Sequence, residues 1–253
     1  MIYDIQKANI WNRASAYLFD IIILAIMVIA FSFTLSFITG YDNYNTALSE
    51  YQKTYEEKYN VSFTLSLEEY ESLDDDQRKA LDDANAAFSV DPDVVYAYNM
   101  VINLSLLIIS LSFLFAILIY EFVIPLLLKN GQTLGKKIFG IGLMKNDGIK
   151  VNSVSLLVRA LLGKYTIETM IPLFIGMMVF FGSLGILGTI IIFAILLLQI
   201  IVICATHTNS AIPDLLANTV VVDIQSQMIF DSENDLIEYK KKVAKEAAAD
   251  RRY

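Results

Sequence analysis

The sequence predicts an all-α integral membrane protein with four transmembrane helices, a small cytoplasmic β-hairpin and an extracytoplasmic helical loop. Three observations support this fold class. Hydrophobic residues make up 56% of the 253 residues, above the share that soluble proteins carry. The apolar residues gather into long runs with almost no charge. The lysines and arginines of the connecting segments would all lie on one side of a four-span chain.

Three apolar runs are long enough to cross a bilayer, because about 20 helical residues span about 30 Å of hydrocarbon. Residues 15–39 contain one charged residue, Asp20, and residues 94–128 contain only Glu121. Residues 171–204 contain no charged residue. The first run is too long for the apolar part of a signal peptide, so we expect it to remain as a span.

The last apolar run decides the number of spans. A single helix over residues 171–204 would be about 51 Å long, too long for one crossing. Three glycines within residues 181–188 favour a tight turn between two antiparallel helices. A single kinked helix with a re-entrant half is the alternative. The predicted spans are residues 15–39, 97–121, 165–183 and 186–204.

The basic residues of the short loops set the orientation, because such residues are retained in the cytoplasm. They lie before the first span, between the second and third spans, and after the fourth: Lys7, Arg13, Lys129, Lys136, Lys137, Lys145, Lys150, Arg159, Lys164, Lys240, Lys241, Lys242, Lys245, Arg251 and Arg252. Four spans place all three groups on one side. We therefore expect a multi-pass protein of a prokaryotic cell membrane with both termini in the cytoplasm.

The acidity of the chain is confined to residues 41–93, which hold 14 acidic and 4 basic residues, although the net charge of the whole chain is −8. We expect this extracytoplasmic insertion to be helical, because Ser66-Leu-Glu-Glu69 has the spacing of a capping box. The transmembrane domain would cover residues 1–224, and residues 225–253 would form a charged cytoplasmic tail helix.

Two short segments on the cytoplasmic side have β-forming patterns. Residues 140–151 flank the turn Asn146-Asp147-Gly148 and predict a hairpin, to which residues 219–224 can add a strand. Ser153 is expected to cap a helix that begins at Val154 and leads into the third span.

Asp20 is the sharpest candidate for a functional residue, because an ionisable group within a span needs a partner, water or neutralisation. Arg13 lies seven residues earlier and faces the same way, and Arg159 and Lys164 are further possible partners. Two interpretations remain open. One is an ion pair that fixes the first helix against its neighbours, and the other is a carboxylate that alternates between a proton and a cation.

Two further carboxylates lie near the ends of predicted spans. Glu121 is at the inner end of the second span, and Glu168 is about one turn from Lys164. Either can be an interfacial anchor or a member of a charged site.

Other chemistry has little support. Gly131-Gln-Thr-Leu-Gly-Lys136 lacks the spacing of a phosphate-binding loop, and Cys204 with His207 is too small a set for a metal site. No paired catalytic residues stand out, so we expect no enzyme activity. We also expect no cofactor, no metal and no nucleic-acid partner.

Three segments together resemble the RDD family of prokaryotic membrane proteins, which is named for one arginine and two aspartates. They are residues 12–20, residues 131–140 with 157–161, and residues 212–222, in the order of the family. On this match Arg13, Asp20 and Asp214 occupy the three name-giving positions. Leu215 and Asn218 depart from the family pattern, which often has a basic residue and a glycine there.

The resemblance implies a membrane protein for which transport has been suggested, with sodium/proton exchange associated with some members. The first functional hypothesis is therefore a transporter that exchanges monovalent cations for protons at Asp20, with Asp214 at the cytoplasmic exit and a homo-oligomer as its assembly. The alternative is a non-transporting membrane scaffold that binds other proteins through the outer acidic loop and the cytoplasmic tail.

Overall fold

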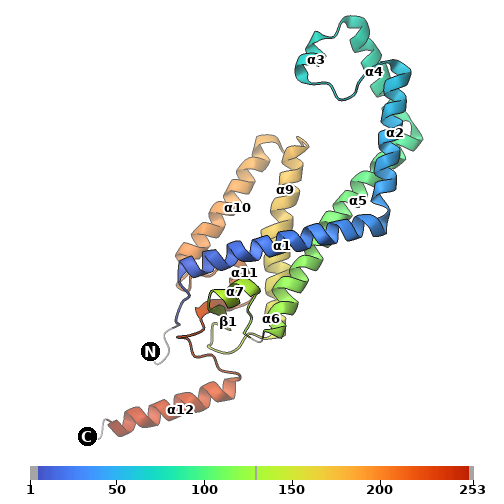
Figure 1. Ribbon diagram of the computed structural model, residues 1–253. Helices are drawn as coiled ribbons and strands as arrows, with labels where there is room; N and C mark the ends of the chain where they lie inside the picture. The colour runs from blue at the N-terminus through green and yellow to red at the C-terminus, as the bar shows by residue number, and fades with distance from the viewer. Residues whose placement is uncertain (1–4, 129, 251–253) are drawn as a thin grey trace. The chain divides into compact units, whose positions relative to one another are not determined.

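The computed structural model describes residues 5–128 and 130–250. Lys129, Arg251 and Arg252, which contribute to the predicted orientation, lie outside these residues. Contacts divide the chain into two compact units, one of Met1–Val28 with Phe113–Tyr253 and one of Ile29–Ser112. The two longest apolar helices, α1 (Ile10–Thr39) and α5 (Pro92–Ile117), each run from one unit into the other (Figure 1).

Within the described residues, three helices are long and apolar enough to cross a membrane. They are α1, the continuous helix Pro92–Leu127 and α10 (Gly185–Ala205). These correspond to the first, second and fourth predicted spans. The segment predicted as the third span lies in another continuous helical stretch, which consists of α8 (Ser153–Val158), η2 (Arg159–Met170) and α9 (Ile171–Phe180).

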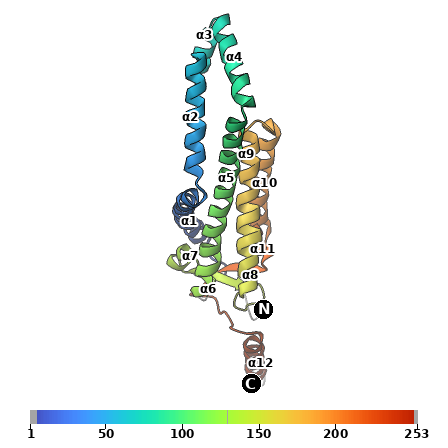
Figure 2. The same cartoon turned by 90° about the vertical axis from the view of Figure 1, so that its right-hand side faces the viewer.

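The apolar run at residues 171–204 forms two helices and not one kinked helix. Helices α9 and α10 pack side by side (Figure 2). Gly182, with φ 73°, and Gly185, with φ 51°, supply the left-handed backbone of the turn between them. The turn is closed by backbone hydrogen bonds such as Ser183 N–H to Met178 O at 2.8 Å.

Two segments form π-helices, a feature that the sequence did not predict. They are η1 (Leu118–Val123) and η2, and they pack against each other. Each ends shortly before a proline, Pro125 in α6 (Ile124–Leu127) and Pro172 in α9. Because proline lacks an N–H and crowds the carbonyl four residues earlier, a wider turn before it relieves the clash. Those carbonyls belong to Glu121 and Glu168.

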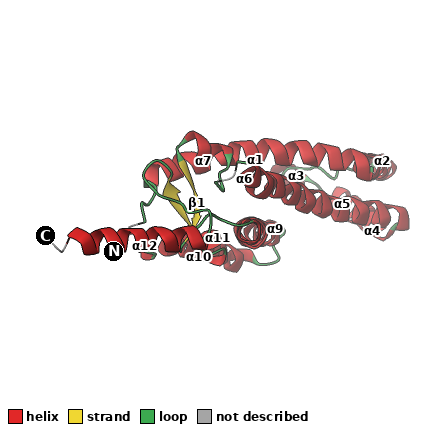
Figure 3. Ribbon diagram, turned by 90° about the horizontal axis from the view of Figure 1, so that it is seen from below, coloured by secondary structure: helices red, strands yellow, loops and turns green. Residues whose placement is uncertain are grey.

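A two-stranded antiparallel sheet lies in the unit that contains both chain ends (Figure 3). Strand β1 (Ile141–Lys145) pairs with β2 (Thr219–Asp223), with Leu143 opposite Val221. Ile141, Leu143 and Val221 belong to one buried cluster, and Met144, Val220 and Val222 belong to another. Because both faces of the sheet are covered, β2 is apolar along most of its length.

The predicted hairpin at residues 140–151 is therefore only partly correct. The turn forms, with Gly148 N–H donating to Lys145 O at 3.0 Å, but the return strand is reduced to one bridge between Met144 and Lys150. The Lys150 N–H donates instead to Phe230 O at 2.8 Å. The strand that pairs with β1 is β2, which lies in residues 219–224, the segment that the sequence predicted only as an extra strand beside the hairpin.

The helix after the turn begins one residue earlier than predicted. Asn152, not Ser153, is its N-cap, and the Asn152 side chain accepts from Ser155 N–H at 2.8 Å. Either residue type can cap a helix. The remaining elements of this unit are α7 (Leu134–Ile138), α11 (Ile212–Leu216) and α12 (Glu233–Asp250).

The acidic insertion is helical, as predicted. It contains α2 (Tyr41–Tyr59), α3 (Leu67–Ser72) and α4 (Asp75–Val90). The capping box of Ser66 and Glu69 is confirmed, and Asp74 and Gln77 form a second one. Leu81 and Ala84 are buried on α4, and the rings of Tyr55 and Phe63 pack on Phe88. The insertion thus has a small apolar core of its own.

Candidate functional site

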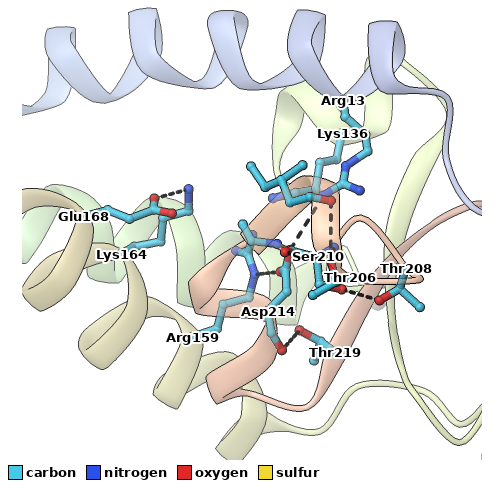
Figure 4. A network of polar contacts seen from close by, with 12 residues as sticks. Arg13, Lys136, Arg159, Lys164, Glu168, Thr206, Thr208, Ser210, Asp214 and Thr219 are labelled. Carbon is cyan, nitrogen blue, oxygen red and sulfur yellow. Dashed lines mark hydrogen bonds and ion pairs between the residues drawn. The ribbon is translucent and has the colours of Figure 1, made fainter. Parts of the chain in front are cut away.

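Arg159 stands at the centre of a buried ionic network (Figure 4). Its Nε donates to Asp214 Oδ1 at 2.9 Å, and its Nη1 donates to Glu121 Oε2 at 2.6 Å. The exposed fractions of Arg159, Asp214 and Glu121 are 4%, 1% and 3%. Charges buried this deeply are tolerated only when they are paired and hydrogen-bonded, so the network fixes the three segments that carry them.

Those three segments are η1, η2 and α11. Glu121 lies within η1, Arg159 is the first residue of η2, and Asp214 lies in the first turn of α11. Helix α11 lies close against η2 because position 163 is glycine, and a Cβ there would overlap Pro213. This close approach brings the Asp214 carboxylate within reach of Arg159.

Two more cations border the network at longer distances. Lys136 Nζ lies 3.6 Å from Glu121 Oε2, and Arg13 Nη2 lies 3.9 Å from Asp214 Oδ2. Lys136 is in α7 and is 7% exposed, whereas Arg13 reaches in from α1. Both distances exceed those of a hydrogen bond, so these cations contribute through charge alone.

Lys164 and Glu168 form a separate ion pair at 2.6 Å within η2. The Lys164 ammonium also lies 5.0 Å from the centre of the Tyr17 ring on α1. This pair lines the same cavity as the network, described below.

Asp20 has a different set of partners from those predicted. Its Oδ1 accepts from the Tyr120 hydroxyl at 2.6 Å and from Gly135 N–H at 2.9 Å, and its Oδ2 accepts from the Thr133 hydroxyl at 2.6 Å. In the described part of the chain no cation lies within ion-pair distance of Asp20. The expected pairing of Asp20 with Arg13 is thus replaced. Segment η1 and the start of α7 supply neutral donors to Asp20, and α11 supplies the carboxylate that faces Arg13.

Gly135 permits this arrangement. A Cβ at this position would lie 2.5 Å from both Ala16 O and Asp20 Oδ1. Only glycine lets the α7 backbone approach α1 closely enough to donate to the carboxylate.

All of these charged groups line one cavity of about 330 Å³. It contains four cationic and four carboxylate side chains, together with an apolar wall from α1 and α10. The lining residues that enter the arguments below are Ile10, Arg13, Ala14, Asp20, Glu121, Lys136, Arg159, Lys164, Glu168, Ile203 and Asp214. The volume is within the range of small-molecule sites.

The pKa values of the groups outside the spans follow from burial and neighbouring charge. Burial alone would raise the pKa of Asp214, but the bonded Arg159 and the nearby Arg13 hold it below its usual value. Burial lowers the pKa of Lys136, an effect that Glu121 opposes only in part. Asp214 therefore favours the ionised state more strongly in the folded protein than in the unfolded chain.

The depressed pKa of Asp214 predicts a pH dependence of stability. Its ionised form stabilises the fold above the unfolded pKa of about 3.9, and this contribution is lost as pH falls through the lower folded value. We expect the free energy of unfolding to fall more steeply below about pH 4 in the wild type than in Asp214→Asn. Unfolding in detergent at several pH values measures this slope. Asp231→Asn, at an exposed carboxylate, should keep the wild-type slope, and an unchanged slope in Asp214→Asn would contradict the assignment.

Every residue that the sequence singled out lies at this cavity: Arg13, Asp20, Glu121, Arg159, Glu168 and Asp214. The sequence did not single out Tyr120, Thr133, Gly135 or Lys136. The segment that contains the last three was noted for its unsuitable phosphate-loop spacing and for its resemblance to the RDD family, but not as part of a site. The adjacent Gly135 and Lys136 were the sequence feature that could have indicated a role in the site, because Gly135 bonds to Asp20 and Lys136 lies near Glu121.

Comparison with known protein families gives one match, which covers the residues of this site. The sequence model of a family described as the RDD family matches residues 7–218. The chain belongs to the RDD family. No curated protein and no solved structure matches the chain significantly.

The RDD match includes every charged residue of the cavity. The structure brings Arg13 and Asp214 within 3.9 Å of each other, and it places Asp20 on the same cavity with separate partners. These three residues thus belong to one site with two different parts, an ionic network and a carboxylate bonded to neutral groups.

Proposed function

We propose that this RDD protein is a membrane transporter that exchanges a monovalent cation for protons, with Asp20 as the group that carries either one. The observation that supports this proposal is the bonding of Asp20. It lines the cavity, is 4% exposed, and has three neutral hydrogen-bond donors as its partners.

Hydroxyl partners suit a carboxylate that changes its charge. The Tyr120 and Thr133 hydroxyls donate to an ionised Asp20, and either can rotate and accept from a protonated one. Their oxygens can also contribute to the coordination of a bound cation. A guanidinium is only a donor, so a carboxylate that takes up a proton beside it loses a bond.

The other carboxylates of the cavity are less suited to this role. Glu121 and Asp214 are both bonded to Arg159, and Glu168 is bonded to Lys164. Breaking such a buried pair leaves an uncompensated charge, which is strongly unfavourable. We assign the network the task of holding α1, α11 and the two π-helical segments around Asp20.

The proposal includes four spans with both termini in the cytoplasm. The start of α1, segment η1 and the end of α10 all meet the cavity, which supports an even number of crossings. The helical stretch from Ser153 to Phe180 would supply the third span over residues 165–183, and the insertion would lie outside. Cysteines introduced at Asp147 and Ser72 in a Cys204→Ser background test this, because only the second should react with an impermeant maleimide in intact cells.

The direct test of exchange uses everted membrane vesicles that contain the protein. Addition of Na⁺, K⁺ or Li⁺ should move protons across the membrane in the wild type, and Asp20→Asn at equal expression should abolish this movement. Asp231→Asn is the matched control, because it removes an exposed carboxylate, and should retain the movement. Equal movement in Asp20→Asn and wild type would exclude the proposal.

A second candidate function is favoured by the insertion, which has a small apolar core of its own. Under this alternative the protein is a scaffold that binds other membrane proteins through residues 41–93. Replacement of this segment by a short linker should then abolish partner recovery after crosslinking and leave the insertion of the protein into the membrane intact. Unchanged recovery would count against it.

A further inference from the structure

Arg13 and Lys136 are the two cations of the cavity that have no close carboxylate partner. Arg159 and Lys164 have carboxylate oxygens at 2.6–2.9 Å, whereas Lys136 and Arg13 have theirs at 3.6 and 3.9 Å. The Glu121 and Asp214 carboxylates concerned are already bonded to Arg159.

Lys136 is the more unusual of the two. Its side chain is 9% exposed, and its ammonium carries three donors, yet among the described residues no acceptor bonds to it. A buried ammonium is costly unless its donors are satisfied. Figure 4 shows Arg13 and Lys136 extending into the same region beside the network, and both line the cavity.

An anionic group between these side chains would satisfy both. A phosphodiester carries one negative charge and two free oxygens, so one oxygen can accept from the Arg13 guanidinium and the other from the Lys136 ammonium. One negative charge on the phosphodiester is enough, because Asp214 and Glu121 already compensate part of the positive charge of Arg13 and Lys136.

The apolar wall of the cavity indicates what the anion is attached to. Ile10 and Ala14 of α1 and Ile203 of α10 line the same cavity, and both helices are candidate spans. The surfaces of such helices contact hydrocarbon in a bilayer. A free phosphate would leave this wall unused, whereas an acyl chain would cover it.

We propose that Arg13 and Lys136 bind the phosphate of an anionic phospholipid, whose acyl part lies against Ile10, Ala14 and Ile203. This lipid site goes beyond the proposed exchange and is independent of it, because binding requires no cation gradient.

The experiment uses the full chain purified in an uncharged detergent. The probe is a short-chain phosphatidylglycerol below its micelle concentration, with inorganic phosphate as the second probe, and binding is measured by calorimetric titration. Wild type should bind the lipid, and Lys136→Met and Arg13→Gln should each weaken binding about tenfold or more, the loss typical of a charge-assisted hydrogen bond. Lys150→Met, which removes a half-buried cation of the same unit outside the cavity, should bind as the wild type does.

Ile203→Trp provides a test that leaves every charge in place. The larger Trp side chain would occupy the space beside the apolar wall, so it should weaken binding of the lipid. This variant tests the lipid site even if Lys136→Met fails to fold. Inorganic phosphate that binds as tightly as the lipid, or lipid binding that Ile203→Trp leaves unchanged, would overturn the lipid as the ligand. Absence of lipid binding in the wild type, or unchanged binding in Lys136→Met, would overturn the site.

Discussion

Replacement of Arg159 by methionine is expected to lower the free energy of unfolding by about 3–5 kcal/mol, the loss typical of breaking a buried ion pair. The reason is that Glu121 and Asp214, at 3% and 1% exposure, would keep their charges without the cation that bonds to both. Lys136 and Arg13 are too distant to replace its hydrogen bonds without rearrangement. Reversible unfolding in mixed detergent micelles measures this loss.

Lys150→Met is the matched control for Arg159→Met. Lys150 pairs with Asp231 at 3.2 Å, but the Asp231 side chain is 84% exposed, so its loss should cost at most about 1 kcal/mol. The double variant Arg159→Met with Asp214→Asn should recover part of the stability, because it removes one of the two stranded charges. Equal losses for Arg159→Met and Lys150→Met would show that the network does not hold the fold together.

Replacement of Gly163 by alanine is expected to be the second most damaging change, with a loss of about 1–3 kcal/mol from overpacking. The added Cβ would lie 2.7 Å from the Pro213 backbone Cα, so η2 and α11 would have to separate. Separation moves Asp214 away from Arg159 and weakens the pair that the first substitution breaks. The same unfolding measurement applies, and cation-driven proton movement should fall in parallel.

Gly176→Ala controls for the loss of a glycine from the same helical stretch. A Cβ at Gly176 would meet nothing within 4 Å, so this change should be neutral or slightly stabilising. If Gly163→Ala were as stable as Gly176→Ala, the contact of η2 with α11 would not be as close as described.

The sequence was informative about features that depend on local composition. Run length and charge predicted the apolar helices, and the glycines of residues 181–188 predicted the turn between α9 and α10. The capping box at Ser66 depends on four adjacent residues, and it forms as predicted. Such features need no knowledge of distant segments.

The partners of the charged residues could not be predicted in this way. Helical spacing places Arg13 and Asp20 on one face, but it does not say what packs against that face. Asp20 is bonded to residues 100 and 113 positions away, and Arg159 to a residue 55 positions away. These contacts depend on the folding of α7 and α11 against α1 and η2.

The π-helical segments were missed for a related reason. A proline within a helix predicts a kink or the end of the helix. The sequence does not show whether the chain kinks, ends the helix or forms a π-helical turn before the proline. In η2 the Thr166 and Thr169 hydroxyls bond to carbonyls five residues earlier, at 2.9 and 2.8 Å. These bonds satisfy backbone carbonyls within the wider turns of the π-helix. The hydrophobic pattern of the sequence gives no indication of them.

The most direct test of the central claim is proton release from the purified protein on cation addition, followed with a pH-sensitive dye in weakly buffered detergent solution. If Asp20 exchanges a proton for a cation, the wild type and Asp231→Asn should release protons near the pH of half-maximal exchange, and Asp20→Asn should release none. Release from Asp20→Asn equal to that of the wild type, or no release from the wild type at any pH, would contradict the account.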